Sequence, residues 1–168
     1  MQFTKFLFLV SNFIILIQSR TKFTKLDYCT TSNETIEFLQ CYLSDEGQFN
    51  VTFEFLKKVE KIYFLADIFS LIDNNFVEIF KLPKIEWCSI ANNKRHIKGL
   101  IKLHLEPIKK EYPKIFKCPL TGIVNLSTTP NYEHLELFHS GTYRVIFKAH
   151  DDDDENVASI SFVFEIIE

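Results

Sequence analysis

Four cysteines constrain the chemistry of this chain more than any other residues: Cys29, Cys41, Cys88 and Cys118. They show no CxxC spacing and no neighbouring histidine cluster, which disfavours a zinc site. In an exported chain, an even number of cysteines is typical of disulfides rather than free thiols. Of the possible pairings we expect Cys29 with Cys41 and Cys88 with Cys118, because each bridge joins sequence neighbours and closes a loop of moderate length.

The other candidate chemistry is an acidic run, Asp151–Glu155, whose carboxylate oxygens could bind calcium. Its spacing does not match an EF-hand loop, and it lies between two strand patterns, so we interpret it as a solvated hairpin tip. The histidines are scattered and form no HExxH pair, and no GxSxG motif is present. We therefore expect no metal site, no cofactor and no enzymatic activity; the histidines are His96, His104, His134, His139 and His150.

The N-terminal residues predict the compartment. Lys5 is followed by a mostly apolar stretch over 6–17, which is typical of a secretory leader. The stretch is too short for a bilayer span, which needs about 20 residues. We expect cleavage after Ser19, so that residues 1–19 are a signal peptide and residues 20–168 form one domain with a single core.

Three acceptor sequons for N-linked glycosylation agree with export. They begin at Asn33, Asn50 and Asn125, each followed two positions later by Thr or Ser. Each acceptor should occupy a solvent-facing position. The formal net charge is −3 and no basic cluster stands out, so nucleic acid is not an expected partner.

Alternating apolar and polar residues predict half-buried strands. In the stretch 49–58, Val51, Phe53 and Phe55 share one face, and Asn50 lies on the other. Because Asn50 heads a sequon, we expect its face to be wet and the phenylalanines to point inward. The same pattern predicts strands over 120–127, 141–150 and 157–167, and weaker patterns suggest strands over 36–43, 62–71 and 76–88.

The stretch 92–111 has a different period. Ile97, Leu100, Ile101 and Leu105 recur at helical spacing, which predicts one amphipathic helix that ends near Pro107. Many short strands with one helix inserted before Cys118 favour a mainly β fold, an antiparallel sandwich or cup. On this pattern alone, the inward phenylalanines could equally fill a packed core or line an apolar cavity.

Several motifs occur in a recognisable order. After Cys29 and Cys41 come Trp87-Cys88, the helical insertion, the run 116–122 (FKCPLTG), and Gly141-Thr142-Tyr143-Arg144. This order resembles an insect family of small secreted proteins related to the ML lipid-recognition domains, the group that contains the CheB-type chemosensory proteins. The resemblance implies an immunoglobulin-like sandwich whose two sheets splay to admit a lipid or another apolar molecule. It departs at 137–141, where the family commonly has proline, and at the acidic run; we expect both to lie near the mouth of the sandwich.

A binding function follows as an expectation. The partner would be a hydrophobic small molecule or lipid, bound by a secreted monomer that acts in contact chemosensation or pheromone response and engages a membrane receptor or channel. The alternatives are an extracellular protein–protein interaction module with a dry core and an accessory protein that presents lipid to an enzyme; a lipocalin is the second choice of fold. Strand parity selects the expected apolar lining: Phe53, Phe55, Phe64, Trp87, Val124, Tyr143, Phe147, Phe162 and Phe164.

Overall fold

A computed structural model describes residues 21–32, 34–92, 109–110, 112–128 and 140–167. No helix in these ranges has the length and apolar character of a membrane span. The elements in chain order are β1 (Thr21–Thr31), β2 (Ile36–Leu43), β3 (Phe49–Val59), β4 (Tyr63–Ile72), β5 (Asn75–Glu86), α2 (Trp87–Ala91), the 3₁₀ helix η1 (Pro113–Phe116), β6 (Leu120–Thr128), β7 (Gly141–His150) and β8 (Asn156–Ile166).

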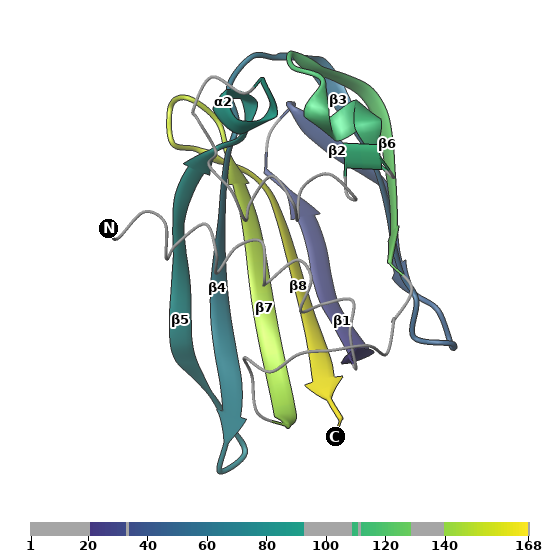
Figure 1. The fold of residues 1–168 in the computed structure, drawn as a ribbon, viewed down its shortest axis with the longest axis vertical. Helices are drawn as coiled ribbons and strands as arrows, with labels where there is room; N and C mark the ends of the chain where they lie inside the picture. Colours follow the sequence, from purple (N-terminus) through teal and green to yellow (C-terminus); the bar gives the residue numbers. More distant parts are fainter. Residues whose placement is uncertain (1–20, 33, 93–108, 111, 129–139, 168) are drawn as a thin grey trace.

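The strands form two antiparallel sheets. One has five strands in the order β1-β8-β7-β4-β5, and the other has three in the order β2-β3-β6. Figure 1 shows the five-stranded sheet from β5 to β1, the three-stranded sheet beyond β1, and α2 at the end where β5 finishes. The mainly β fold with two antiparallel sheets is therefore confirmed.

One tight turn and one glycine within a strand adopt positive φ angles. The β4–β5 hairpin turns at Asp73 and Asn74, whose φ angles are 48° and 64°. Positive φ at both central residues is the requirement of a two-residue type I′ hairpin, and Asp and Asn tolerate it well. In β6, Gly122 has φ 70° beside an irregularity in the β3–β6 ladder, where glycine avoids the strain that a side chain would cause.

Strand parity was predicted correctly in β3, β6, β7 and β8. Val51 and Phe55 are buried, whereas Asn125 is exposed. In β7 and β8 the inward residues Tyr143 and Phe162 are buried as well. These outcomes follow because the side-chain period of a strand is two, so one correctly placed residue fixes the face of all the others.

The first strand was missed. In β1 the inward residues are Phe23, Leu26 and Cys29, which pair with Phe164, Phe162 and Ile160 of β8. Register shifts after Phe23 and Leu26 place them three positions apart. This spacing hides the two-residue alternation by which strands are recognised.

The end of β5 also differs from the prediction. The expected strand extended to Cys88, but the chain turns into α2 at Trp87. Glu86 is the N-cap, and its carboxylate accepts a hydrogen bond from the backbone N–H of Ser89. Most of the amphipathic helix predicted over 92–111 lies outside the described residues.

Among the residues that the structure describes, the buried side chains form two clusters. The first lies wholly on the five-stranded sheet and comprises Phe23, Ala66, Ile68, Leu82, Tyr143, Val145, Phe162, Phe164 and Ile166. The second draws on both sheets and on α2, and comprises Ile36, Phe55, Val59, Ile62, Cys88, Leu120, Val124, Ala149, Val157 and Ala158. The two sheets are thus joined by shared buried residues mainly in the second cluster.

Candidate functional site between the two sheets

The inner face of the three-stranded sheet is aromatic. Phe53 of β3 pairs with Phe38 of β2 on one side and with Val124 of β6 on the other. The ring centroid of Phe53 lies 6.4 Å from that of Phe38 and 5.4 Å from that of Phe55, both in edge-to-face geometry. Such pairs favour ordered rings, so this face presents a continuous apolar surface to the opposite sheet.

The inner face of the five-stranded sheet is aromatic as well. Phe162 is 3% exposed, and its ring centroid lies 5.3 Å from that of Phe23 and 6.0 Å from that of Phe147. Tyr143 stacks on Phe164 with centroids 5.5 Å apart. Burial raises the pKa of the Tyr143 phenol, so this hydroxyl stays neutral over the whole physiological range.

Several large inward side chains of both sheets are only half-buried. On the three-stranded sheet these are Phe38, Phe53 and Leu126. On the five-stranded sheet they include Phe64, Phe147 and Ile160. In a closed sandwich the inner faces interdigitate into one contiguous core. Here the described parts of the two sheets fill each other's faces incompletely.

The contact between the sheets differs along their length. In the second cluster, buried residues of β2, β3 and β6 meet buried residues of β7 and β8. Against the first cluster, the three-stranded sheet contributes only the half-buried Leu43 and Phe49 among the described residues. The Phe49 ring lies 5.2 Å from that of Phe162 and 5.7 Å from that of Phe23. The described sheets are therefore closed at the α2 end and less closed at the other.

One disulfide joins a strand of each sheet, and the other joins α2 to the segment that precedes β6. Cys29 of β1 is bonded to Cys41 of β2, with their Cα atoms 6.4 Å apart. Cys88 of α2, which follows β5, is bonded to Cys118, which precedes β6, with their Cα atoms 5.6 Å apart. This is the pairing that the sequence predicted. The bridges lie at opposite edges of the five-stranded sheet, so they hold the two layers together without a fully interdigitated core.

The closed end is sealed by aromatic residues. The Trp87 ring packs against Phe64, 5.7 Å away, and Phe116, 5.0 Å away. The indole N–H of Trp87 donates a hydrogen bond of 2.6 Å to the carbonyl oxygen of Ile115 in η1. Because its polar group is satisfied, Trp87 can sit half-buried between α2 and η1 and anchor the segment that leads to Cys118.

The nine side chains that the sequence assigned to an apolar lining differ in how deeply the structure buries them. Five are buried within the clusters, namely Phe55, Val124, Tyr143, Phe162 and Phe164. The remaining four are half-buried: Phe53, Phe64, Trp87 and Phe147. Because Phe64 and Trp87 pack on each other at the closed end, Phe53 and Phe147 are the better candidates for ligand contact.

Sequence reasoning missed some half-buried inward residues, notably Phe38 and Phe80. Phe38 lies one position before a register shift in β2, and Phe80 directly follows one in β5. Each register shift exchanges the inward and outward positions along the rest of the strand, so alternation alone could not assign these residues to the inner face. Their inward direction became clear only from their cross-strand partners, Phe53 and Ile68, which the structure identifies.

The outer face of the five-stranded sheet is charged. Asp67 is 4% exposed, and its carboxylate forms ion pairs with two lysines. Its Oδ2 lies 2.8 Å from Lys148 Nζ, and its Oδ1 lies 3.3 Å from Lys81 Nζ. Burial alone would raise the pKa of Asp67, but the hydrogen bonds and charges of Lys148 and Lys81 outweigh it and lower the pKa. Asp27 is likewise paired, with Arg144 Nε at 2.9 Å and Lys25 Nζ at 2.8 Å. The charged groups of β4 and β7 thus lie on the opposite side of the sheet from the aromatic ones.

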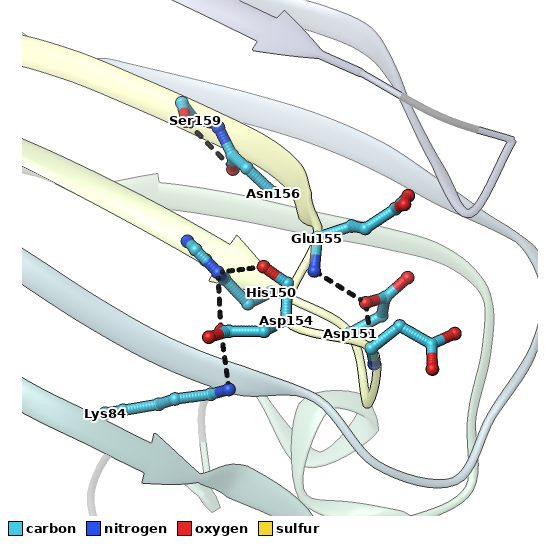
Figure 2. Close-up of polar contacts among 8 residues, drawn as sticks. Lys84, His150, Asp151, Asp154, Glu155, Asn156 and Ser159 are labelled. Atoms are coloured by element: carbon cyan, nitrogen blue, oxygen red, sulfur yellow. Dashed lines mark hydrogen bonds and ion pairs between the residues drawn. The ribbon is translucent and has the colours of Figure 1, made fainter.

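The acidic run forms the turn between β7 and β8, as predicted (Figure 2). The Asp151 carboxylate accepts hydrogen bonds from the backbone N–H groups of Asp153 and Glu155. Asp154 contacts Lys84 Nζ at 2.7 Å and His150 Nδ1 at 3.1 Å. Hydrogen bonds from Lys84 and His150 lower the pKa of Asp154. No group of three or more His, Cys, Asp or Glu side chains in the described ranges is arranged to hold a metal.

One prediction about this turn was wrong. We expected the run 137–141 and the acidic turn both to lie near the mouth. Strand β7 starts at Gly141 and ends at His150, so Gly141, at the described end of that run, and the acidic turn lie at opposite ends of one extended strand; residues 137–139 lie outside the described residues. His150 pairs with Tyr63, and the neighbouring Ala149 belongs to the second cluster, which places the acidic turn at the closed end.

Two glycosylation acceptors lie on described strands. Asn50 and Asn125 are on the outer face of the three-stranded sheet, opposite in parity to Val51 and Val124. Asn125 is exposed and Asn50 is half-buried. The third acceptor, Asn33, and the predicted leader lie outside the described residues, as do all the histidines except His150.

Comparison with known proteins gave distant structural likenesses. No family model matches the chain, and no curated protein matches its sequence. A Niemann-Pick type C2 protein from the Japanese carpenter ant is 12% identical, with a TM-score of 0.33 over 87% of this chain and 92% of that one. Chicken MD-1, solved with lipid IVa, is 11% identical, with a TM-score of 0.38 over 88% and 98%. The Pseudomonas fluorescens alkylpurine DNA glycosylase AlkC is 10% identical, with a TM-score of 0.27 over 91% and 32%. All three TM-scores are low, so these likenesses do not assign the chain to a family.

Proposed function

We propose that this chain is a secreted binding protein that holds a lipid or another apolar molecule between its two sheets. One observation carries the proposal: large inward side chains of both sheets, including Phe53 and Phe147, are half-buried although disulfides join the layers at two edges. A hydrophobic ligand would cover this surface and gain about 2.5 kcal/mol for each 100 Å² or so removed from water. The sequence resemblance supports the same class of function.

Export is part of the proposal. The leader over 1–19, the sequons and the disulfides support a secreted domain that spans residues 20–168. Edman sequencing of protein secreted from eukaryotic cells should begin at Arg20. A first residue upstream of Ser19, or retention of the protein in the membrane fraction, would contradict this part. A role in chemosensation, with a receptor or channel as a second partner, rests on the sequence resemblance alone.

The direct test of ligand binding is recovery of a bound molecule. The full chain is expressed in a secreting host, and an organic extract of the purified protein is analysed by mass spectrometry. We expect a stoichiometric long-chain molecule, or binding of a fluorescent fatty acid or of a hydrocarbon to the delipidated protein. Protein that is empty and binds none of these probes would contradict the proposal.

Matched variants locate the site. Phe53→Glu and Phe147→Glu place a carboxylate on the inner faces, and burying a charge against an apolar ligand is costly, so each should weaken binding at least about tenfold. Leu56→Glu is the control, because Leu56 also lies in β3 but is 48% exposed. Circular dichroism and a thermal melt verify that each variant is folded. Equal affinity of all three variants and the wild type would exclude the space between the sheets as the site.

One observation favours the second candidate, an interaction module. The β4–β5 hairpin, at the end opposite α2 in Figure 1, carries four aliphatic side chains that are between 39% and 48% exposed: Leu71, Ile72, Val77 and Ile79. Exposed apolar side chains gathered in one place are typical of contact surfaces. If the protein proves empty and Val77→Glu abolishes capture of a partner protein, the interaction module is the better description.

A further inference from the structure

The two described sequons face each other across the β3–β6 ladder. Asn50 pairs with Ser127, and Thr52 pairs with Asn125. The acceptor of each sequon therefore lies opposite the hydroxyl residue of the other. All four side chains share the outer face, because Val51 between them is 2% exposed and points inward. Diagonal neighbours on paired strands are about 7 Å apart, so the two acceptors lie side by side.

The hydrogen bonds of Asn50 are compatible with a glycan. Its side-chain oxygen accepts a bond of 2.8 Å from the Ser127 hydroxyl, and its amide nitrogen donates one of 3.3 Å to the carbonyl oxygen of Gln48. A primary amide has two N–H groups. Replacing one of them with a sugar leaves the other for Gln48 and the oxygen for Ser127.

Exposed apolar side chains flank both acceptors. Tyr42 of β2 pairs directly with Asn50 and is 48% exposed. Ile123 of β6 lies two positions from Asn125 on the same face and is 43% exposed. Directly paired cross-strand neighbours have Cβ atoms about 5 Å apart, which brings the Tyr42 ring within reach of a group attached to Asn50.

We propose that the outer face of the three-stranded sheet is a glycan-bearing face, with N-linked oligosaccharides at Asn50 and Asn125 in the same molecule and Tyr42 as the platform for the first sugar at Asn50. The two glycans cover Tyr42 and Ile123 and keep this face free of protein partners. The inference goes beyond ligand binding, because it concerns the opposite side of the sheet and holds whether or not the inner faces bind a lipid.

The modification is a group transfer from a lipid-linked oligosaccharide diphosphate. The bond between the anomeric carbon of the first N-acetylhexosamine and the phosphate oxygen breaks, and that carbon forms a bond to Nδ2 of the asparagine. The amide nitrogen loses one proton and the lipid diphosphate leaves. Transfer precedes folding, so the sequons must only be intact, while the folded sheet determines what surrounds each glycan afterwards.

Glycopeptide mass spectrometry of the secreted protein tests occupancy. A protease that cuts after Glu separates Asn50 from Asn33, and native mass spectrometry counts the glycans on each molecule. We expect most molecules to carry glycans at both Asn50 and Asn125. Ser127→Ala should remove the glycan at Asn125, whereas the matched control Ser127→Thr should keep it. Secreted, folded protein in which either acceptor is mostly unmodified would overturn the proposal.

A double-mutant cycle between Tyr42→Ala and Asn50→Gln tests the platform. If the Tyr42 ring packs on the first sugar, Tyr42→Ala should raise the unfolding equilibrium constant about threefold more in the glycosylated protein than in the Asn50→Gln background. Tyr42→Phe keeps the ring and should keep the coupling. Should Tyr42→Ala not be secreted, wild type and Tyr42→Leu, which lacks the aromatic ring, can be compared before and after enzymatic deglycosylation. Identical effects with and without the glycan would contradict the assigned role of Tyr42.

Discussion

Removing the disulfides one at a time tests how the two sheets are held together. Both bridges link the layers, but they close loops of different length, with sequence separations of 12 for Cys29–Cys41 and 30 for Cys88–Cys118. The entropy that a cross-link removes from the unfolded chain grows with the logarithm of loop length. For loops of these lengths it amounts to about 2.8 and about 3.6 kcal/mol. Replacing both cysteines of a bridge by alanine should therefore cost more for Cys88–Cys118.

The measurements are urea unfolding and thermal melts of the two double-alanine variants, both followed by tryptophan fluorescence of Trp87 and by circular dichroism. At about 3 °C for each kcal/mol, the melting temperatures should fall by about 8 °C and about 11 °C. If loss of Cys29–Cys41 costs more free energy than loss of Cys88–Cys118, the reasoning is refuted. The cost would then come mainly from native contacts at the β1–β2 edge and not from the entropy of the unfolded chain. A folded variant whose ligand affinity equals that of the wild type would show that this bridge does not set the separation of the sheets.

Three further perturbations have defined outcomes. Phe162→Ala, in the buried first cluster, should lower the free energy of unfolding by about 3–5 kcal/mol, whereas Phe53→Ala at its half-buried site should cost distinctly less in the same urea titration. The pKa of Asp67 is lowered in the folded state, so its stabilising effect is present above the unfolded value near 4 and is lost as pH falls through the folded value. In acid titrations followed by circular dichroism, wild type should lose more stability below pH 4 or so than Asp67→Asn does; parallel curves would refute this. Gly122→Ala should cost about 1 kcal/mol from backbone strain alone, because no atom lies within 4 Å of the added Cβ, and a cost near zero would contradict the positive φ.

Much of the strand pattern could be predicted from sequence because it is local. The faces of β3 and β7 follow from alternation, and the sequon at Asn50 fixed which side was wet. The prediction also failed for a local reason. In β1, register shifts separate Phe23, Leu26 and Cys29 by three positions, and a pattern with period two cannot be read through them.

The pairing of charges and the openness of the core required the tertiary structure. Nothing near Asp154 in sequence identifies Lys84 as its partner, since 70 residues separate them and only the order of strands in the sheet brings them together. Likewise, Phe53 and Phe55 are indistinguishable in the sequence, yet one is half-buried and the other buried. Burial depends on what the opposite sheet places over each residue.

The sequence by itself determined the inward and outward faces of most strands and the acidic turn, because each depends on residue type and spacing along a short stretch of chain. It favoured one disulfide pairing among three, and the structure established that pairing. Only the tertiary structure decided that the Cys29–Cys41 bridge joins the two sheets, that buried residues join the layers mainly at the α2 end, and that two sequons face each other on one outer surface. These features depend on which strands become neighbours and in what register, and long-range pairing of that kind is set by the packing of the whole chain.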